Sequence, residues 1–299
     1  MRGLIFGASG LLGRALQREL ERRREPFLAM DHRAADITDP AQVVKVVRWF
    51  EPDVLYNCAA FTRVDDCEAH AELAREVNGR AVAHLAVASR SAGAMLVQVS
   101  TDYVFDGAAR APYVEEAEVA PLQEYGRSKL LGEREALRWE RSVVVRTSWL
   151  FSACGPSFAA TMVRLLAHGG QGGGGLAGEQ PVRVVDDQVG CPTYAPFLAR
   201  ALADLAARGA RGVVHYRNAD AVSWHGFAAE IARRVAPGRA VVPVSTAEFP
   251  RPARRPAYSV LDVERFEAIV GRPVEAWRDG LDECLPELLA AARSLAPKT

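Results

Sequence analysis

Several features that mark other classes of protein are missing from this chain of 299 residues. The five cysteines are odd in number, widely spaced and without a C-x-x-C pair, which argues against a disulfide framework or a zinc site and favours a reducing cytoplasm. The 37 basic and 37 acidic residues cancel, so no net charge attracts nucleic acid or a membrane surface. We also find neither a signal-peptide pattern nor an apolar run near the roughly 18 residues of a membrane span.

The first half of the chain alternates short apolar runs with segments that carry apolar residues at helical spacing. This alternation predicts an α/β fold built on a Rossmann-type, doubly wound parallel sheet that is covered by helices on both faces. The expected strands are Gly3–Phe6, Pro26–Met30, Val54–Tyr56, Met95–Ser100 and Val143–Arg146. The expected helices are Leu11–Arg24, Pro40–Phe50, Glu72–Ala92 and Tyr125–Leu137.

The rhythm changes after Trp149. Six glycines fall within Gly169–Gly175, which predicts a mobile surface linker. Beyond it, short strands mix with the expected helices Tyr194–Arg208, Trp224–Val235 and Pro286–Leu295 and with a Pro/Arg-rich stretch over Pro250–Pro256. We therefore expect a dinucleotide-binding domain over residues 1–150, with later returns near 181–190 and 211–217, and a smaller mixed α/β substrate-binding domain over residues 151–299.

A glycine-rich loop follows the first strand directly. Gly7, Gly10 and Gly13 have the spacing G-x-x-G-x-x-G, and a helix begins within the motif. Gly7 permits a tight turn, Gly10 lets the backbone approach a pyrophosphate, and Gly13 lets the helix pack close to the strand. Because a helix N-terminus presents free N–H groups to phosphates, the loop predicts a dinucleotide site.

Other residues that follow strands are expected to line the same crevice. Asp31 ends the second strand, where a carboxylate accepts hydrogen bonds from an adenosine ribose and favours NADH. Arg33, two residues later, suits the 2′-phosphate of NADPH, so the cofactor preference stays open. Further crevice residues are expected in two segments, Asp36–Ile37 and Asn57–Ala60, although the second also fits a plain turn of small residues.

Three residues form a candidate catalytic group. Thr101 follows a strand, so its hydroxyl emerges at the carboxyl end of the sheet, while Tyr125 and Lys129 lie four apart on one helix face. Hydride delivery to a ketone leaves negative charge on oxygen, which needs a proton donor. An ammonium beside a phenol lowers the phenol pKa, so we expect Lys129 to bring the Tyr125 pKa closer to neutrality. An exposed Tyr–Lys pair that arises by chance is the alternative.

The chain resembles the extended short-chain dehydrogenases/reductases and, among them, the dTDP-4-dehydrorhamnose reductase family. The matching segments span nearly the whole chain. They are residues 7–13, Asp36–Asp39, Asn57–Thr62, Ser100–Gly107, Tyr125–Glu133, Arg146–Trp149, Asp187–Thr193, and Arg255–Pro256 with Ser259.

The resemblance implies reduction of the C4 ketone of dTDP-4-dehydro-6-deoxy-L-mannose with NADPH or NADH, in a monomer or homodimer. It implies that Tyr125 is the proton donor, with Lys129 and Thr101 assisting. The implied cofactor contacts are Gly10, Leu11, Leu12, Asp31, Asp36, Ile37, Ala60, Phe61 and Thr62, besides Ala59 from the crevice argument. The implied sugar-nucleotide contacts are Thr101, Asp102 and Trp149, the last as an apolar plate unless it is an ordinary core tryptophan.

Two departures and two alternatives accompany this resemblance. Some relatives bind magnesium at a dimer interface through an acid just after the glycine loop, where this chain has Arg14-Ala15, which argues against such a metal. The six-glycine tract is also unlike the usual family loop. The alternatives are a ketoreductase for another nucleotide deoxysugar and a non-catalytic regulatory subunit like the β subunit of methionine adenosyltransferase.

Overall fold

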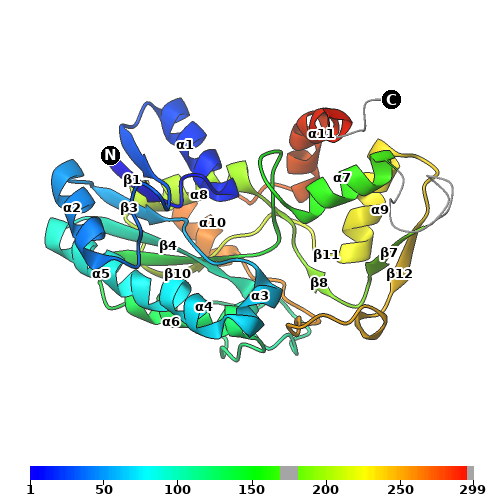
Figure 1. Ribbon diagram of the computed structural model, residues 1–299, viewed down its shortest axis with the longest axis horizontal. Coiled ribbons are helices and arrows are strands. Elements are labelled where there is room, and N and C mark those ends of the chain that lie inside the picture. The colour runs from blue at the N-terminus through cyan, green and yellow to red at the C-terminus, as the bar shows by residue number, and fades with distance from the viewer. Residues whose placement is uncertain (169–180, 295–299) are drawn as a thin grey trace.

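A six-stranded parallel sheet forms one end of the protein, whose computed structural model describes residues 1–168 and 181–294 (Figure 1). Its strand order is β2-β1-β3-β4-β5-β10. The strands are β1 (Gly3–Phe6), β2 (Phe27–Met30), β3 (Val54–Asn57), β4 (Met95–Thr101), β5 (Ser142–Thr147) and β10 (Gly212–His215). The order reverses between β1 and β3, and ligands of such sheets bind at the carboxyl ends of the strands on either side of that point.

Helices cover both faces of this sheet, as the sequence predicts. Ile5 and Tyr56 point to the face covered by α1 (Leu11–Arg23) and α8 (Ala195–Ala207). Leu4 and Leu55 point to the opposite face, against α2 (Pro40–Phe50) and α5 (Ala81–Ala92), with α6 (Glu124–Ala136) beside them. Since neighbouring residues of these strands are buried on opposite faces, the inner strands carry consecutive apolar residues, such as Leu4–Phe6 of β1 and Val54–Tyr56 of β3.

Between β3 and β5 the chain supplies the elements that surround the carboxyl edge. They are α3 (Val64–Ala69), α4 (Ala71–Arg75), a π-helical turn η1 (Glu76–Arg80) that runs into α5, and the 3₁₀ turn η2 (Asp102–Val104) after β4. The expected helix over Glu72–Ala92 is thus three consecutive helical pieces. A π turn inserted in an α-helix frequently marks a functional site.

The rest of the chain forms a second group of elements at the other end of the molecule (Figure 1). Three two-stranded sheets pair β6 with β9, β8 with β11 and β7 with β12. Their strands are β6 (Leu150–Phe151), β7 (Val182–Val185), β8 (Val189–Gly190), β9 (Thr193–Tyr194), β11 (Val222–Ser223) and β12 (Val241–Val244). The remaining helices of this group are α7 (Phe158–His168), α9 (Trp224–Val235), η3 (Thr246–Glu248) and α11 (Trp277–Ser294), whereas α10 (Glu264–Val270) packs against β10 and α8 beside the large sheet.

The second half of the chain differs from the expected organisation in two respects. The return near 211–217 is β10, but β7 and β8 of the range 181–190 pair outside the six-stranded sheet, so that expected return is wrong. The expected helix Pro286–Leu295 begins earlier, at Trp277, and Pro286 lies inside it. The linker expected over Gly169–Gly175 lies outside the described residues, and the domain division at residue 150 stays a prediction. Within residues 1–168 and 181–294, no helix has the length and apolarity that a membrane crossing requires.

Candidate active site

The glycine loop joins β1 to α1 with very little space around it. Gly7 has φ +79, and a Cβ there would lie 2.5 Å from the backbone nitrogen of Ala59. A Cβ on Gly13 would lie 2.2 Å from the Gly7 carbonyl oxygen, so α1 packs directly on the loop. Gly10 is exposed, and a Cβ there would meet only the Gly7 oxygen, at 3.2 Å. Gly7 and Gly13 therefore serve backbone packing, whereas Gly10 leaves an open surface.

This open surface fits the pyrophosphate of a dinucleotide. Gly10 is the N-cap of α1, and no side chain there bonds to the first N–H groups of the helix. Those of Leu11, Leu12 and Gly13 have no intrahelical acceptor because they belong to the first turn. Arg14 donates from Nε to the Ser9 carbonyl oxygen (2.9 Å). Among the described residues, no three His, Cys, Asp or Glu side chains gather as metal ligands.

The end of β2 carries the residues expected to meet the adenosine ribose. The Asp31 carboxylate accepts hydrogen bonds from the backbone N–H groups of Arg33 (3.0 Å) and Ala34 (2.9 Å), which fixes it at the strand end. Arg33 is exposed. Asp36 accepts from the Thr38 hydroxyl (2.8 Å), and Ile37 is buried. The Asp31 carboxylate is thus held in place, and the exposed guanidinium of Arg33 lies two residues further along the chain.

The loop after β3 is held in place by two asparagines. Asn57 is buried, donates to Gln98 on β4 (2.8 Å) and accepts from the N–H of Ala59 (3.1 Å). Asn78, in the π turn η1, accepts from the Phe61 N–H (2.8 Å) and donates to the Phe61 carbonyl (3.0 Å). The segment that contains Ala60 and Thr62 is therefore anchored on both sides. Asn78 was not expected from the sequence, because its role depends on the π turn that brings it to Phe61.

The structure brings the predicted catalytic residues together at the carboxyl edge. Thr101 ends β4, and Tyr125 and Lys129 lie one turn apart on α6. The Thr101 hydroxyl donates to Asp102 Oδ1 (3.0 Å), accepts from the Tyr103 N–H (3.1 Å) and hydrogen-bonds to Tyr125. Lys129 is buried and donates from Nζ to the Val99 carbonyl oxygen (2.7 Å). The phenol, the hydroxyl and the ammonium thus all lie at the last three residues of β4.

The protonation of these groups differs from the expectation in one respect. The pKa of Tyr125 is raised, chiefly by burial and then by Asp102, and the hydrogen bond with Thr101 opposes this only in part. The expected lowering of the tyrosine pKa by Lys129 is therefore wrong, because loss of hydration dominates and the Lys129 ammonium is bonded to Val99 instead of acting on the phenol.

Burial also acts on the two charged neighbours. It lowers the pKa of Lys129 to about 8, although Glu133 and Cys58 act in the opposite direction. It raises the pKa of Asp102 to about 7, against hydrogen bonds from Ser259 and Thr101. Among the residues that the structure describes, no donor hydrogen-bonds to the buried Oδ2 atom of Asp102, so this atom is a candidate acceptor for a ligand.

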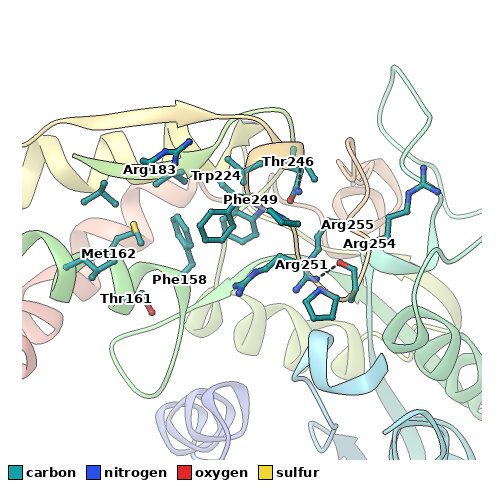
Figure 2. A pocket seen from close by; sticks show the side chains of 18 of the residues that line it. Phe158, Thr161, Met162, Arg183, Trp224, Thr246, Phe249, Arg251, Arg254 and Arg255 are labelled. Carbon is teal, nitrogen blue, oxygen red and sulfur yellow. Dashed lines mark hydrogen bonds between the residues drawn. The ribbon is translucent and has the colours of Figure 1, made fainter. Parts of the chain in front are cut away.

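A cavity of about 1070 Å³ lies in the second half of the molecule and reaches toward this edge (Figure 2). Its lining includes the aromatic rings of Phe158, Trp224 and Phe249, and the first two rings are 4.6 Å apart. Tyr103 also lines it and meets Tyr125 edge to face, with 6.1 Å between ring centres. Five arginines belong to the lining: Arg183, Arg239, Arg251, Arg254 and Arg255. The cavity therefore offers apolar plates and cations, and Tyr103 links its lining to the candidate proton donor Tyr125.

Trp149 lies behind the cavity lining. Its ring stacks on Trp224 at 3.4 Å between centres, and Gly190 packs against its edge closely enough that a Cβ there would lie 2.6 Å from the indole. Its φ of +47 is strained for a large side chain, and such strain concentrates at functional sites. The direct contact of Trp149 with a sugar stays a prediction, whereas Trp224, which sequence reasoning missed, lines the cavity.

Comparison with known proteins adds independent observations. The family model described as RmlD substrate binding domain matches residues 1–290. The dTDP-4-dehydrorhamnose reductase of Streptomyces griseus is 41% identical, over 99% of this chain and 97% of that protein. A probable dTDP-4,6-dihydroxy-2-methyloxan-3-one 4-ketoreductase of Streptomyces antibioticus is 40% identical over 97% of both chains.

Solved structures agree in fold. The dTDP-4-dehydrorhamnose reductase of Bacillus anthracis in complex with NADP has a TM-score of 0.88 and 35% identity, and the match covers 96% of this chain and 99% of that one. The orthologous enzyme from Clostridium acetobutylicum has a TM-score of 0.89 and 38% identity, covering 96% and 99%. The similarity thus extends over both halves of the molecule.

Proposed function

The chain belongs to the RmlD substrate binding domain family, and from that premise we propose that it is an NAD(P)H-dependent reductase of a nucleotide-activated keto sugar. The reaction is reduction of the C4 ketone of dTDP-4-dehydro-6-deoxy-L-mannose to dTDP-L-rhamnose. The observation that carries the proposal is the meeting of Thr101, Tyr125 and Lys129 at the sheet edge, between the glycine loop and a cavity lined with aromatic rings and arginines.

The residues at the switch between β1 and β3 fit a dinucleotide. The N–H groups of Leu11 and Leu12 at the start of α1 would hold the pyrophosphate, with Gly10 leaving room for it. Asp31 and Arg33 face the adenosine end, and the loop Ala59–Thr62 with Asp36 and Ile37 completes the crevice. When bound, the cofactor supplies the hydride that reduces the ketone. An NADP-bound relative with 35% identity and the exposed Arg33 favour NADPH over NADH.

Tyr125 provides the proton for the developing alkoxide. Its raised pKa keeps the phenol protonated at neutral pH, which is the form that a donor needs. When the phenol releases its proton, the Lys129 ammonium stabilises the phenolate that remains, and the Thr101 hydroxyl turns its O–H from Asp102 toward the phenolate oxygen. Lys129 also faces the nicotinamide ribose in this proposal, and Val99 holds its Nζ in place.

The large cavity suits the rest of the substrate. Aromatic faces stack on a thymine base, and guanidinium groups pair with a diphosphate in bidentate fashion. Asp102 offers its unpaired Oδ2 to a sugar hydroxyl beside Thr101. Trp149 supports Trp224 from behind, in addition to any sugar contact of its own.

A second candidate keeps the chemistry and changes the sugar. The 4-ketoreductase of S. antibioticus is nearly as similar to this chain as the rhamnose enzymes are, at 40% against 41% identity. A third hypothesis is a non-catalytic regulatory subunit. The presence of all three residues Thr101, Tyr125 and Lys129 argues against it. Monomer or homodimer formation and a cytoplasmic location stay predictions.

A substrate panel tests the proposal. We expect absorbance at 340 nm to fall when the protein meets NADPH and dTDP-4-dehydro-6-deoxy-L-mannose, and NMR of the product to show dTDP-L-rhamnose. Turnover with a different dTDP-4-keto-6-deoxy sugar alone would support the second candidate. No consumption of NADPH or NADH with any of these sugars would refute a reductase function.

A further inference from the structure

A buried polar cluster lies directly beneath the catalytic residues. Glu133 on α6 is 2% exposed, Ser100 on β4 is 3% exposed, and Arg146 on β5 is 4% exposed. Glu133 Oε1 accepts from the Ser100 hydroxyl (2.5 Å) and from Arg146 Nε (2.9 Å), while its Oε2 accepts from the terminal guanidinium nitrogen of Arg146 (2.8 Å). The steps proposed above give Glu133 no role.

Stability alone is a weak explanation for such a cluster. Taking a carboxylate and a guanidinium out of water costs several kcal/mol per ion, and a buried ion pair replaced by apolar side chains is often neutral or stabilising. The pair is instead well placed to hold geometry. Its three hydrogen bonds connect α6 to two different strands, β4 and β5.

These bonds reach β4 at the position that matters for catalysis. Ser100 lies between Val99, whose carbonyl oxygen accepts from Lys129, and Thr101, which bonds to Tyr125. Tyr125, Lys129 and Glu133 follow one another at four-residue intervals, so all three lie along one face of α6. A shift of the helix along the strand would break the Glu133 bond and the Lys129 bond together.

Glu133 also sets the charge around Lys129. Burial lowers the pKa of Lys129, and among the groups that oppose this Glu133 comes first, followed by Cys58 in the loop after β3. The groups around Glu133 itself are Arg146 from β5 and Ser100 from β4, and Arg146 in turn contacts His215 on β10 (3.3 Å) and the Glu115 carbonyl (3.4 Å). The π turn on the other side contributes the Asn78 backbone, which packs against Gly132.

We propose that Glu133 is a positioning residue for the reduction: it fixes α6 against residues 99–101 of β4 and places a carboxylate one turn from Lys129 on the same helix face. The inference rests on the proposed reductase function, because both roles given to Lys129, beside the phenolate and at the nicotinamide ribose, belong to that reaction. Glu133 touches neither the reacting atoms nor the ligand in this account, and it acts through Lys129 and Ser100.

The variant Glu133→Gln tests the charge, since it keeps the size of the side chain. We expect the alkaline limb of the kcat profile to move to lower pH by about one pH unit, because Lys129 loses its main stabilising neighbour. At pH 8, where about half of Lys129 is in the ammonium form in the wild type, this corresponds to a fall in kcat of about fivefold. The KM for the sugar nucleotide should stay within about threefold, because the cavity residues are untouched. The measurement is kcat and KM from pH 5.5 to 10 with NADPH.

Two further variants separate this role from a purely structural one. Glu115→Gln removes another buried carboxylate of the same region, which accepts from the His215 N–H (2.9 Å) on β10 rather than from β4. We expect it to lower the unfolding temperature but to leave the alkaline limb in place. Ser100→Ala keeps the Glu133 charge and removes its bond to β4, so kcat should fall without movement of the limb.

The outcomes distinguish this inference from the function on which it rests. If the wild-type enzyme is active and folded Glu133→Gln has the same alkaline limb, the inference alone is overturned. The same holds if Glu115→Gln shifts the limb as far as Glu133→Gln does. A wild-type protein without turnover would refute the proposed function. If Glu133→Gln does not fold, Glu133→Asp takes its place, because it keeps the charge with a shorter side chain. We expect this variant to have a lower kcat and an unmoved alkaline limb. A wild-type kcat, or a limb at lower pH, would overturn the proposal.

Discussion

Two alanine substitutions in the glycine loop should produce opposite patterns. In Gly13→Ala the new Cβ would lie 2.2 Å from the Gly7 oxygen and 2.8 Å from the Ala8 Cα, and both neighbours are backbone atoms that cannot rotate away. The start of α1 must therefore move, and overpacking of this kind costs about 1–3 kcal/mol. In Gly10→Ala the nearest atom is 3.2 Å away, the backbone has φ −72, and replacement at an N-cap costs about 1 kcal/mol or less.

The assay measures both properties in both variants. Urea unfolding gives the free energy of unfolding, and a fluorescence titration gives the Kd for NADPH. We expect Gly13→Ala to be clearly less stable and to bind NADPH more weakly, because the helix N-terminus is displaced. Gly10→Ala should stay near wild-type stability and still lose about tenfold or more in NADPH affinity, because its methyl occupies the approach of the pyrophosphate. Wild-type NADPH affinity in Gly10→Ala would refute the placement of the phosphates at this loop.

Two other predictions concern charge. The Lys129 pKa is lowered to about 8, and the ammonium is the active form, so turnover should be fully present below pH 8 and fall as the pH rises through it. An alkaline limb near the ordinary lysine value of 10.5 would contradict this burial effect. Arg33→Ala should weaken NADPH binding by about tenfold, consistent with loss of one bond between charged groups, and leave NADH unchanged. Equal losses for both cofactors in paired titrations would show that Arg33 does not meet the 2′-phosphate.

The sheet and the cofactor loop were predictable because their signals are local. The expected strands are short, mostly apolar runs that are followed by a polar or small residue. The three glycines of G-x-x-G-x-x-G lie within seven consecutive residues, so the motif is visible without knowledge of distant contacts. The placement of Tyr125 and Lys129 one turn apart on α6 follows from helical spacing alone. The strand-end position of Thr101 follows in the same way from the apolar run before it.

The large cavity was not predictable, because it gathers side chains from segments far apart in sequence. Phe158, Trp224 and Phe249 come from a helix start, another helix start and the end of a 3₁₀ turn, and none has a neighbour in sequence that reveals its partner. The direction of the Tyr125 pKa shift was also missed, since spacing shows which charges are near but not how deeply the phenol is buried.

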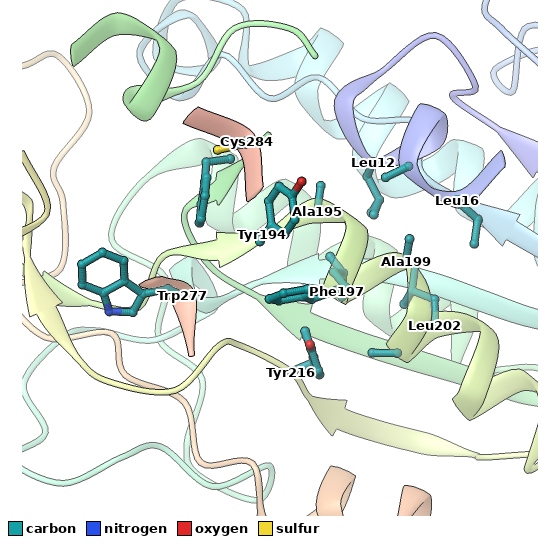
Figure 3. Close-up of a cluster of buried hydrophobic side chains, with 14 of the residues drawn as sticks. Leu12, Leu16, Tyr194, Ala195, Phe197, Ala199, Leu202, Tyr216, Trp277 and Cys284 are labelled. Carbon is teal, nitrogen blue, oxygen red and sulfur yellow. The ribbon is translucent and has the colours of Figure 1, made fainter. Parts of the chain in front are cut away.

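The last helix illustrates a local signal that tertiary packing overrides. Proline is favoured in the first turn of a helix, so Pro286 suggested a start, yet the helix runs from Trp277 through it. Trp277 is fully buried and meets Phe227 edge to face at 5.2 Å, so the first turn is fixed by the core (Figure 3). Pro286 has no N–H to donate to the carbonyl of Asp282, four residues earlier. Both residues are exposed, so water can hydrogen-bond to that carbonyl oxygen.

The most direct test of the account is Tyr125→Phe, which removes one hydroxyl and keeps the ring beside Tyr103. We predict that kcat falls by about 10²–10⁴-fold, the usual contribution of a general acid, while the Kd for NADPH changes by less than about threefold. A kcat within a few-fold of the wild-type value would contradict the assignment of Tyr125 as the proton donor.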